Sequence, residues 1–106
     1  MKQVTTRSVS SIDRLAPSWR LSEAENKSDA TLTSYGYATT QFSAFLKAKG
    51  MPTEVGSISR EHVEAFLVDV MERTSPATAE ARYRGLRQFF NWYEARAKYR
   101  SPRWPA

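Results

Sequence analysis

The fold is decided by residues 75–93, SPATAEARYRGLRQFFNWY, which combine a helix start, an apolar stripe and a row of arginines. Ser75 can accept a hydrogen bond from a free backbone amide of the first turn, and Pro76 suits the first helical position, where no amide donor is needed. At 3.6 residues per turn, one side presents an apolar stripe of Ala79, Tyr83, Leu86, Phe90 and Tyr93, with Phe89 at its edge. The opposite side presents Arg84, Arg87, Gln88 and Asn91. We therefore expect a helix from Pro76 to about Lys98 that packs on one face and is basic on the other.

Two helices are expected near the start of the chain, each with its own start signal. The first can begin at Ser11 and end near residue 26, and the interior Pro17 either kinks it or delays its regular part. Ser28 is a capping residue and Gly50 is a stop signal, so the two bracket a second helix. Its apolar face is formed by Leu32, Tyr35, Thr39, Phe42 and Leu46, with Ala38 and Phe45 beside them. Gly36 inside this helix costs about 1 kcal/mol relative to alanine and marks either close packing or a tolerated weak spot.

A third helix is expected between a loop at residues 51–58 and a short turn at residues 73–74. Ser59 can cap its start. The predicted buried stripe consists of Val63, Phe66, Leu67, Val70 and Met71. The exposed side is acidic through Glu61, Glu64, Asp69 and Glu72, so we expect it to face away from any nucleic acid. No strand-like alternation competes with these helical periods and no segment repeats, so the sequence predicts an all-α fold of four helices.

Composition limits the class of protein. The 106 residues suffice for one domain, and the net charge of +5 favours a polyanionic partner, although an ordinary basic domain has the same balance. With no cysteine and one histidine, His62, neither a disulfide nor a zinc site is expected, and no cofactor is expected. His62 is interpreted as a surface or helix-start residue. No apolar stretch is long enough to span a bilayer and no secretion signal is visible, so we expect no membrane association and a cytoplasmic location.

The order of the helical segments resembles a known family. Its segments are SDATLTSYGYATTQFSAFLKAKG at 28–50, ISREHVEAFLVDVMER at 58–73 and SPATAEARYRGLRQFFNWYEARAK at 75–98. Together they resemble the N-terminal core-binding domain of tyrosine recombinases, the phage-integrase family. The resemblance extends from about Leu15 to Pro102, and one departure is Thr39, where such domains usually have leucine.

The resemblance implies a four-helix SAM-like orthogonal bundle that clamps one side of duplex DNA. A separate catalytic domain would grip the other side. Residues 1–10 are rich in Ser and Thr and have no helical period, so we expect a flexible arm there. The resemblance implies that 11–99 form the DNA-binding domain and that 100–106 begin a linker to an absent catalytic domain. The parent would be a site-specific tyrosine recombinase, acting in integration or recombination of a mobile element and tetrameric on DNA, whereas the isolated domain would be a monomer.

The resemblance also implies which residues contact DNA. Those of the second helix are Thr31, Thr33, Ser34, Tyr37 and Gln41. Those of the fourth helix are Thr78, Arg82, Arg84, Arg87 and Gln88. Arginine can donate two parallel hydrogen bonds to guanine or to a phosphate group, and Gln41 or Gln88 can pair with adenine. Hydroxyl groups near helix starts can donate hydrogen bonds to phosphate oxygens. The last five do not share one narrow face, because Thr78 and Arg82 flank the core stripe and the other three lie opposite.

Catalysis is not expected from this fragment. The family cleaves DNA with a tyrosine held among arginines and acid–base residues of the catalytic domain, and no tyrosine here has such companions. We therefore expect no catalytic residue in this chain, and an independent enzyme would need a cleft of convergent titratable groups that the sequence does not offer.

Two alternatives to DNA binding stay open at the level of sequence. The arginine face of the fourth helix could be an ordinary solvated surface. The chain could also be a helical protein-interaction module in which Trp92, Trp104 and the basic tail meet an acidic partner. Phe89, Phe90 and Tyr93 are interpreted as core residues rather than as a platform for stacking bases.

Overall fold

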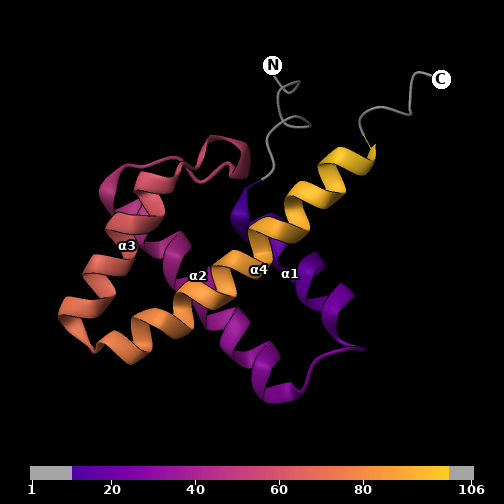
Figure 1. Cartoon of the computed structure of the whole chain (residues 1–106). Coiled ribbons are helices and arrows are strands. Elements are labelled where there is room, and N and C mark those ends of the chain that lie inside the picture. Colours follow the sequence, from indigo (N-terminus) through magenta and orange to yellow (C-terminus); the bar gives the residue numbers. More distant parts are fainter. Residues whose placement is uncertain (1–10, 101–106) are drawn as a thin grey trace.

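Four α-helices make up most of the chain in the computed structural model, which describes residues 11–100, with side chains to residue 96 (Figure 1). They are α1 (Ile12–Glu23), α2 (Asp29–Lys49), α3 (Arg60–Arg73) and α4 (Pro76–Arg100), with a 3₁₀ turn η2 (Val55–Ser57) before α3. In Figure 1, α4 crosses α2, while α1 and α3 lie on opposite sides of this crossing. The all-α prediction is confirmed, and within the described residues β pairing is limited to an isolated bridge between Ser11 and Glu54.

The starts of α2 and α4 are built by the same four-residue cap. The Ser28 hydroxyl accepts from the Thr31 amide at 3.2 Å and donates to the Thr31 hydroxyl oxygen at 3.0 Å. Ser75 makes the same two bonds to Thr78, both at 3.1 Å. Gly50 ends α2 in the left-handed conformation, with φ of 71°, which is why glycine serves as a stop there. These predicted starts and the predicted stop are confirmed.

The other two helix starts also follow the sequence, with one correction in α1. The Ser11 hydroxyl accepts from the Arg14 amide at 3.2 Å, and the helix then runs through Pro17 to Glu23, so its regular part is not delayed to Pro17. An interior proline removes one backbone hydrogen bond, which the packing of α1 offsets. At α3, His62 Nδ1 accepts from the Ser59 amide at 2.8 Å, so the lone histidine is a helix-start residue.

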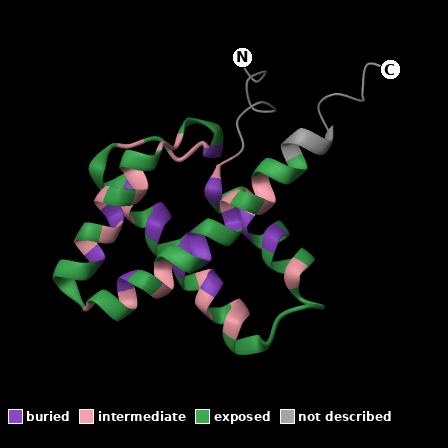
Figure 2. Ribbon diagram, viewed as in Figure 1, coloured by how far each residue is buried: buried purple, intermediate pink, exposed green. Residues whose placement is uncertain are grey.

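The core gathers where the four helices meet, as the purple segments of Figure 2 show. The Trp19 ring stacks on Tyr35 with centroids 4.6 Å apart and meets Phe89 edge-on at 5.3 Å, joining α1, α2 and α4. The largest fully buried side chains are Trp19, Phe42, Phe66, Phe89, Ile12, Leu46, Leu86 and Val70. Thr39 is buried as well, and its hydroxyl donates within α2, to the carbonyls of Tyr35 and Gly36, both at 3.3 Å. A hydroxyl therefore fits where leucine was the expected family residue.

Two residues assigned to the core by periodicity are exposed. Tyr83 is 43% exposed and Met71 is 45% exposed, so both predictions were wrong. The buried side chains of α4 include Leu86 and Phe89 instead. Tyr83 lines a hollow between α3 and α4. Met71 follows the buried Val70, and successive helical side chains diverge by about 100°, so it points away from the core.

The two glycines inside helices mark close approaches of different kinds. A Cβ on Gly85 of α4 would lie 2.8 Å from the Cβ of Ala38 on α2, and Ala38 is fully buried, so the two backbones approach closely at the crossing. A Cβ on Gly36 would meet the Arg20 guanidinium carbon at 3.2 Å, and that side chain can move. Gly36 therefore fits the second of the two interpretations that the sequence left open, a tolerated weak spot, whereas the close packing is at Gly85.

Gly85→Ala is expected to destabilise the domain by roughly 1–2 kcal/mol. Overpacking costs about 1–3 kcal/mol, and the upper half of this range is expected because the fully buried Ala38 Cβ has no freedom to move, whereas the gain in helix propensity is about 1 kcal/mol. Urea unfolding followed by circular dichroism measures the change. Gly36→Ala is the matched control, because its neighbour can give way, and it should be neutral or stabilising. A Gly85→Ala variant as stable as wild type would contradict this description of the crossing.

An ion pair ties α1 to α2 and gives the fold a pH dependence. Lys47 Nζ donates to Asp13 Oδ2 at 2.7 Å, and this contact lowers the pKa of Asp13 below its ordinary value. A carboxyl with a lowered pKa adds stability above its unfolded pKa of about 3.9, and this contribution is lost as the pH falls through the lower folded value.

We therefore expect Asp13→Asn to cost about 0.2–1 kcal/mol at pH 7, a small effect because both side chains are more than half exposed. The difference from wild type should shrink as the pH falls below about 4, because the wild-type carboxyl becomes protonated there. Thermal unfolding at pH 7 and pH 3 measures both quantities. Equal differences at the two pH values would show that the ion pair is not their source.

Candidate nucleic-acid interface

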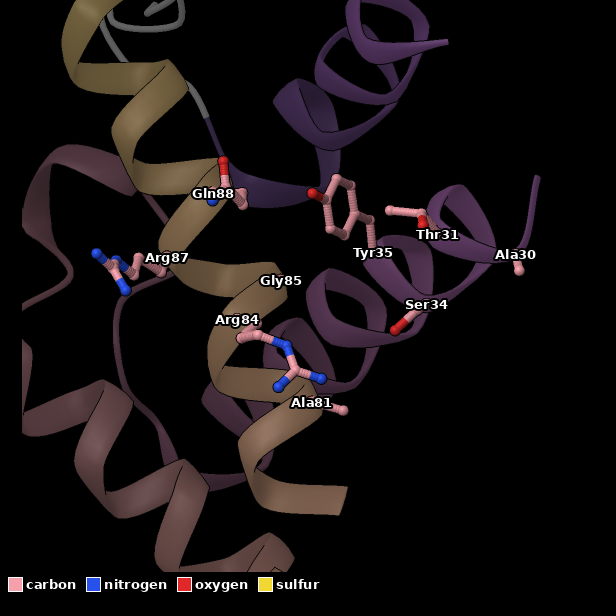
Figure 3. A pocket seen from close by; sticks show the side chains of 9 residues that line it. All are labelled: Ala30, Thr31, Ser34, Tyr35, Ala81, Arg84, Gly85, Arg87 and Gln88. Carbon is pink, nitrogen blue, oxygen red and sulfur yellow. The ribbon is translucent and has the colours of Figure 1, made fainter. Parts of the chain in front are cut away.

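A groove lies between α2 and α4 beside their crossing, with a volume of about 360 Å³. Figure 3 shows its lining: Arg84 extends from α4 toward α2, while Arg87 extends from the other side of α4. Its lining includes the small residues Ala81 and Gly85, and the two helices approach closely at Gly85. The complete lining is Ala30, Thr31, Ser34, Tyr35, Ala81, Arg84, Gly85, Arg87 and Gln88, called here the α2–α4 groove.

A second group of polar side chains lies on another side of the crossing. Arg82 Nε donates to Gln41 Oε1 at 2.9 Å, and the guanidinium carbon lies 5.6 Å from the centre of the Tyr37 ring. We call Tyr37, Gln41 and Arg82 the Arg82 cluster. Gln41, Thr78 and Arg82 also line a hollow of about 480 Å³ together with residues of α3.

The ten predicted contact residues thus divide into two groups and one outlier. Five of them line the α2–α4 groove: Thr31, Ser34, Arg84, Arg87 and Gln88. Four gather around Arg82: Tyr37, Gln41, Thr78 and Arg82 itself. Thr33 is exposed on α2 and lines neither of these two hollows. Thr78 and Arg82 therefore lie apart from Arg84, Arg87 and Gln88.

The charges of the groove are available to a ligand. Arg84 Nη1 lies 3.3 Å from Glu80 Oε2, but both side chains are more than half exposed, so solvent screens the pair and it is weak. Arg87 makes no ion pair with any described side chain, and it also lines the hollow between α3 and α4 next to Arg60. An anion entering the groove would therefore meet the Arg84 guanidinium, which can exchange its partner, while the unpaired Arg87 guanidinium extends from the other side of α4 (Figure 3).

The arginines of α3 are engaged differently. Arg73 Nε lies 2.8 Å from Asp69 Oδ2, and Arg60 Nε lies 3.3 Å from Glu64 Oε2, so each neutralises an acid on its own helix. Glu61 and Glu72 are exposed on the same helix. The outer side of α3 is thus acidic, as predicted, and none of these acids lines the α2–α4 groove. Asp69, however, lines the second hollow together with Gln41, Thr78 and Arg82, so this acid does not face away from all the predicted DNA contacts.

Sequence reasoning missed two cations of the second hollow. Lys49 and Arg73 line it, and their sequence signal was a favourable charge at the end of a helix. Only the packing of the end of α3 beside α2 shows that they converge. Among the described residues, no group of His, Cys, Asp or Glu side chains could hold a metal ion. None of the described helices combines the length and the apolar character that crossing a membrane requires.

Comparison with known proteins identifies a family. The family model for the phage integrase, N-terminal SAM-like domain, matches residues 19–98, from Trp19 in α1 through α2, α3 and nearly all of α4. No curated protein and no solved structure matches the chain.

Proposed function

Because this chain belongs to the family of phage integrase N-terminal SAM-like domains, we propose that it binds duplex DNA through the surface where α4 crosses α2. The matched domain is the non-catalytic part of such proteins. In this proposal the chain is the DNA clamp of a site-specific tyrosine recombinase, and strand cleavage belongs to another domain. The parent would act as a tetramer on DNA, and the isolated domain would be a monomer.

The observation that carries the proposal is the convergence of polar side chains from two helices around the α2–α4 groove. Arg84, Arg87 and Gln88 come from α4, and Thr31 and Ser34 come from α2. Guanidinium groups bind phosphate oxygens through parallel donors, and hydroxyls and amides add hydrogen bonds that fix the position of the duplex. Phosphate contacts of this kind supply affinity without reading sequence.

The cap of α2 leaves Thr31 equipped for such a contact. Its hydroxyl oxygen accepts from Ser28 at 3.0 Å, so its own proton stays free to donate. Its backbone amide is already bonded to Ser28 and is not available. Thr31 would therefore contact a phosphate through the hydroxyl proton.

The alternative of a protein-interaction module has less support. Trp92, one of the two tryptophans considered for it, packs against the core, with its ring 5.9 Å from Phe89 and covered by the Arg96 guanidinium at 5.0 Å. Trp104 lies outside the described residues, as do the expected arm at 1–10 and the tail from residue 101.

The test is an anisotropy titration of a fluorescent duplex with the whole chain at several salt concentrations. With about four or five phosphate contacts, log K should fall linearly with log salt with a slope of about −4. An apolar interface with a protein would show little salt dependence. Absence of duplex binding at about 50 mM salt would contradict the proposal.

A further inference from the structure

The Arg82 guanidinium is held in place on two sides before any ligand is present. Its Nε donates to Gln41 Oε1 at 2.9 Å, across 41 positions of sequence. Its central carbon also lies over the Tyr37 ring, 5.6 Å from the ring centre. The hydrogen bond to Gln41 holds the edge of the guanidinium that carries Nε, and the Tyr37 ring restricts movement of the guanidinium plane.

This arrangement leaves the other edge of the guanidinium free. Among the described residues, neither terminal nitrogen of Arg82 makes a hydrogen bond or an ion pair. The two terminal N–H groups therefore present a parallel pair of donors in a fixed direction. Such a pair matches the two acceptors that guanine shows in the major groove, O6 and N7.

The setting of the cluster also suits a major groove. Thr33, Tyr37 and Gln41 recur every four residues along α2, so they form one outward line, and all three are exposed. Arg82 reaches this line from α4. A helix with its side chains is about 10–12 Å wide, close to the width of the major groove of about 12 Å.

Arg82 differs in this respect from the arginines of the α2–α4 groove. Arg84 has a single partner, Glu80, on its own helix, and Arg87 makes no ion pair with a described side chain. Arg82 is instead held from another helix by two side chains, Gln41 and Tyr37, and its bond to Gln41 is exposed as well. Adaptable cations suit phosphates, whose positions along the backbone are the same for every sequence. A fixed pair of donors suits a base edge, because discrimination requires a defined geometry.

We propose that Arg82 reads a guanine of the DNA target, with Gln41 and Tyr37 as its positioning residues. This inference rests on the proposed function, since it assigns sequence reading to one cluster of a surface that binds the duplex. It also gives Gln41 a role different from pairing with adenine, because its carbonyl oxygen is used by Arg82.

The experiment starts with selection from a duplex library with a randomised core, followed by sequencing. Wild-type protein should enrich a motif that includes a guanine, and Arg82→Ala should lose the preference at that position. The selected duplex is then compared with one carrying 7-deazaguanine there, which lacks the N7 acceptor. Wild type should lose about 5-fold or more in affinity on this change, whereas Arg82→Ala should bind both duplexes equally.

Three further variants separate base reading from a structural tie between helices. Arg82→Lys keeps the positive charge but loses the parallel pair of N–H donors, so it should still bind the duplex but no longer discriminate between guanine and 7-deazaguanine. Gln41→Ala should weaken discrimination, and Gln41→Glu, which still accepts from Nε, should retain it. Arg84→Ala should bind more weakly but select the same motif. Thermal unfolding of each variant shows that it is folded.

The outcomes are distinguishable. If Arg82→Ala weakens both duplexes by the same factor, or if wild type selects no guanine, Arg82 is not a base reader although the protein still binds DNA. If wild type binds no duplex at all, the proposed function fails and this inference fails with it.

Discussion

Replacing Arg84 and Arg87 together by alanine is expected to weaken duplex binding roughly 60-fold at about 0.1 M salt. Each phosphate contact contributes about 0.9 to the slope of log K against log salt, so two lost contacts remove about 1.8 from it. At about 1 M salt this electrostatic contribution vanishes, so the variant and the wild type should bind equally there. At about 0.1 M salt, one decade lower, the association constant of the variant should therefore be about 1.8 decades below that of the wild type. Both side chains are exposed, so the fold should be unaffected.

Anisotropy titrations at several salt concentrations measure both the affinity and the slope. The matched control is Arg14→Ala with Arg20→Ala, which removes the same charge from α1, where both side chains are exposed and neither lines the α2–α4 groove or the hollow that Arg87 shares with α3. A loss of similar size in this control would show that only net charge matters. Glu80→Gln should act in the opposite direction, because it removes the acid 3.3 Å from Arg84.

What the sequence predicts well here is local. Ser28 and Ser75 each bond to a threonine three residues later, so the capping pattern is contained within one turn. Gly50 stops α2 because its left-handed conformation suits glycine and little else. These features need no knowledge of the other helices.

What the sequence predicts poorly depends on how the helices cross. Tyr83 fits the apolar period of α4 but is exposed, whereas Leu86 and Phe89 are buried. Which side of α4 is buried depends on how this helix contacts α2. The approach of Gly85 to Ala38 is a relation between two helices that no single helical period encodes. Arg82 could be predicted as a DNA contact only through the family resemblance, and its bond to Gln41 follows from the same crossing.

Trp19→Ala is expected to reduce the free energy of unfolding by about 3–5 kcal/mol, the largest stability effect we predict. The indole is fully buried, and it holds α1 to both crossing helices through Tyr35 and Phe89. Since domains have only about 5–15 kcal/mol in total, the variant should be at or near the limit of folding. Urea unfolding followed by circular dichroism measures the loss. Leu21→Ala is the matched control, because this residue lies on the same helix but is 77% exposed, and its effect should stay within about 0.5 kcal/mol.

The same variant connects the core to the proposed interface, because Tyr35 packs on Trp19 and also lines the α2–α4 groove. Removing the indole should therefore loosen one wall of the groove and weaken duplex binding as well as folding. Binding and folding are linked, so duplex at 100 times its dissociation constant should stabilise the wild-type domain by about 2.7 kcal/mol. The weakened variant should gain less from the same concentration of duplex. If Trp19→Ala lost less than about 1 kcal/mol, α1 would not be packed as described. If the duplex stabilised both proteins equally, the stack of Trp19 on Tyr35 would not be needed to hold the wall of the groove.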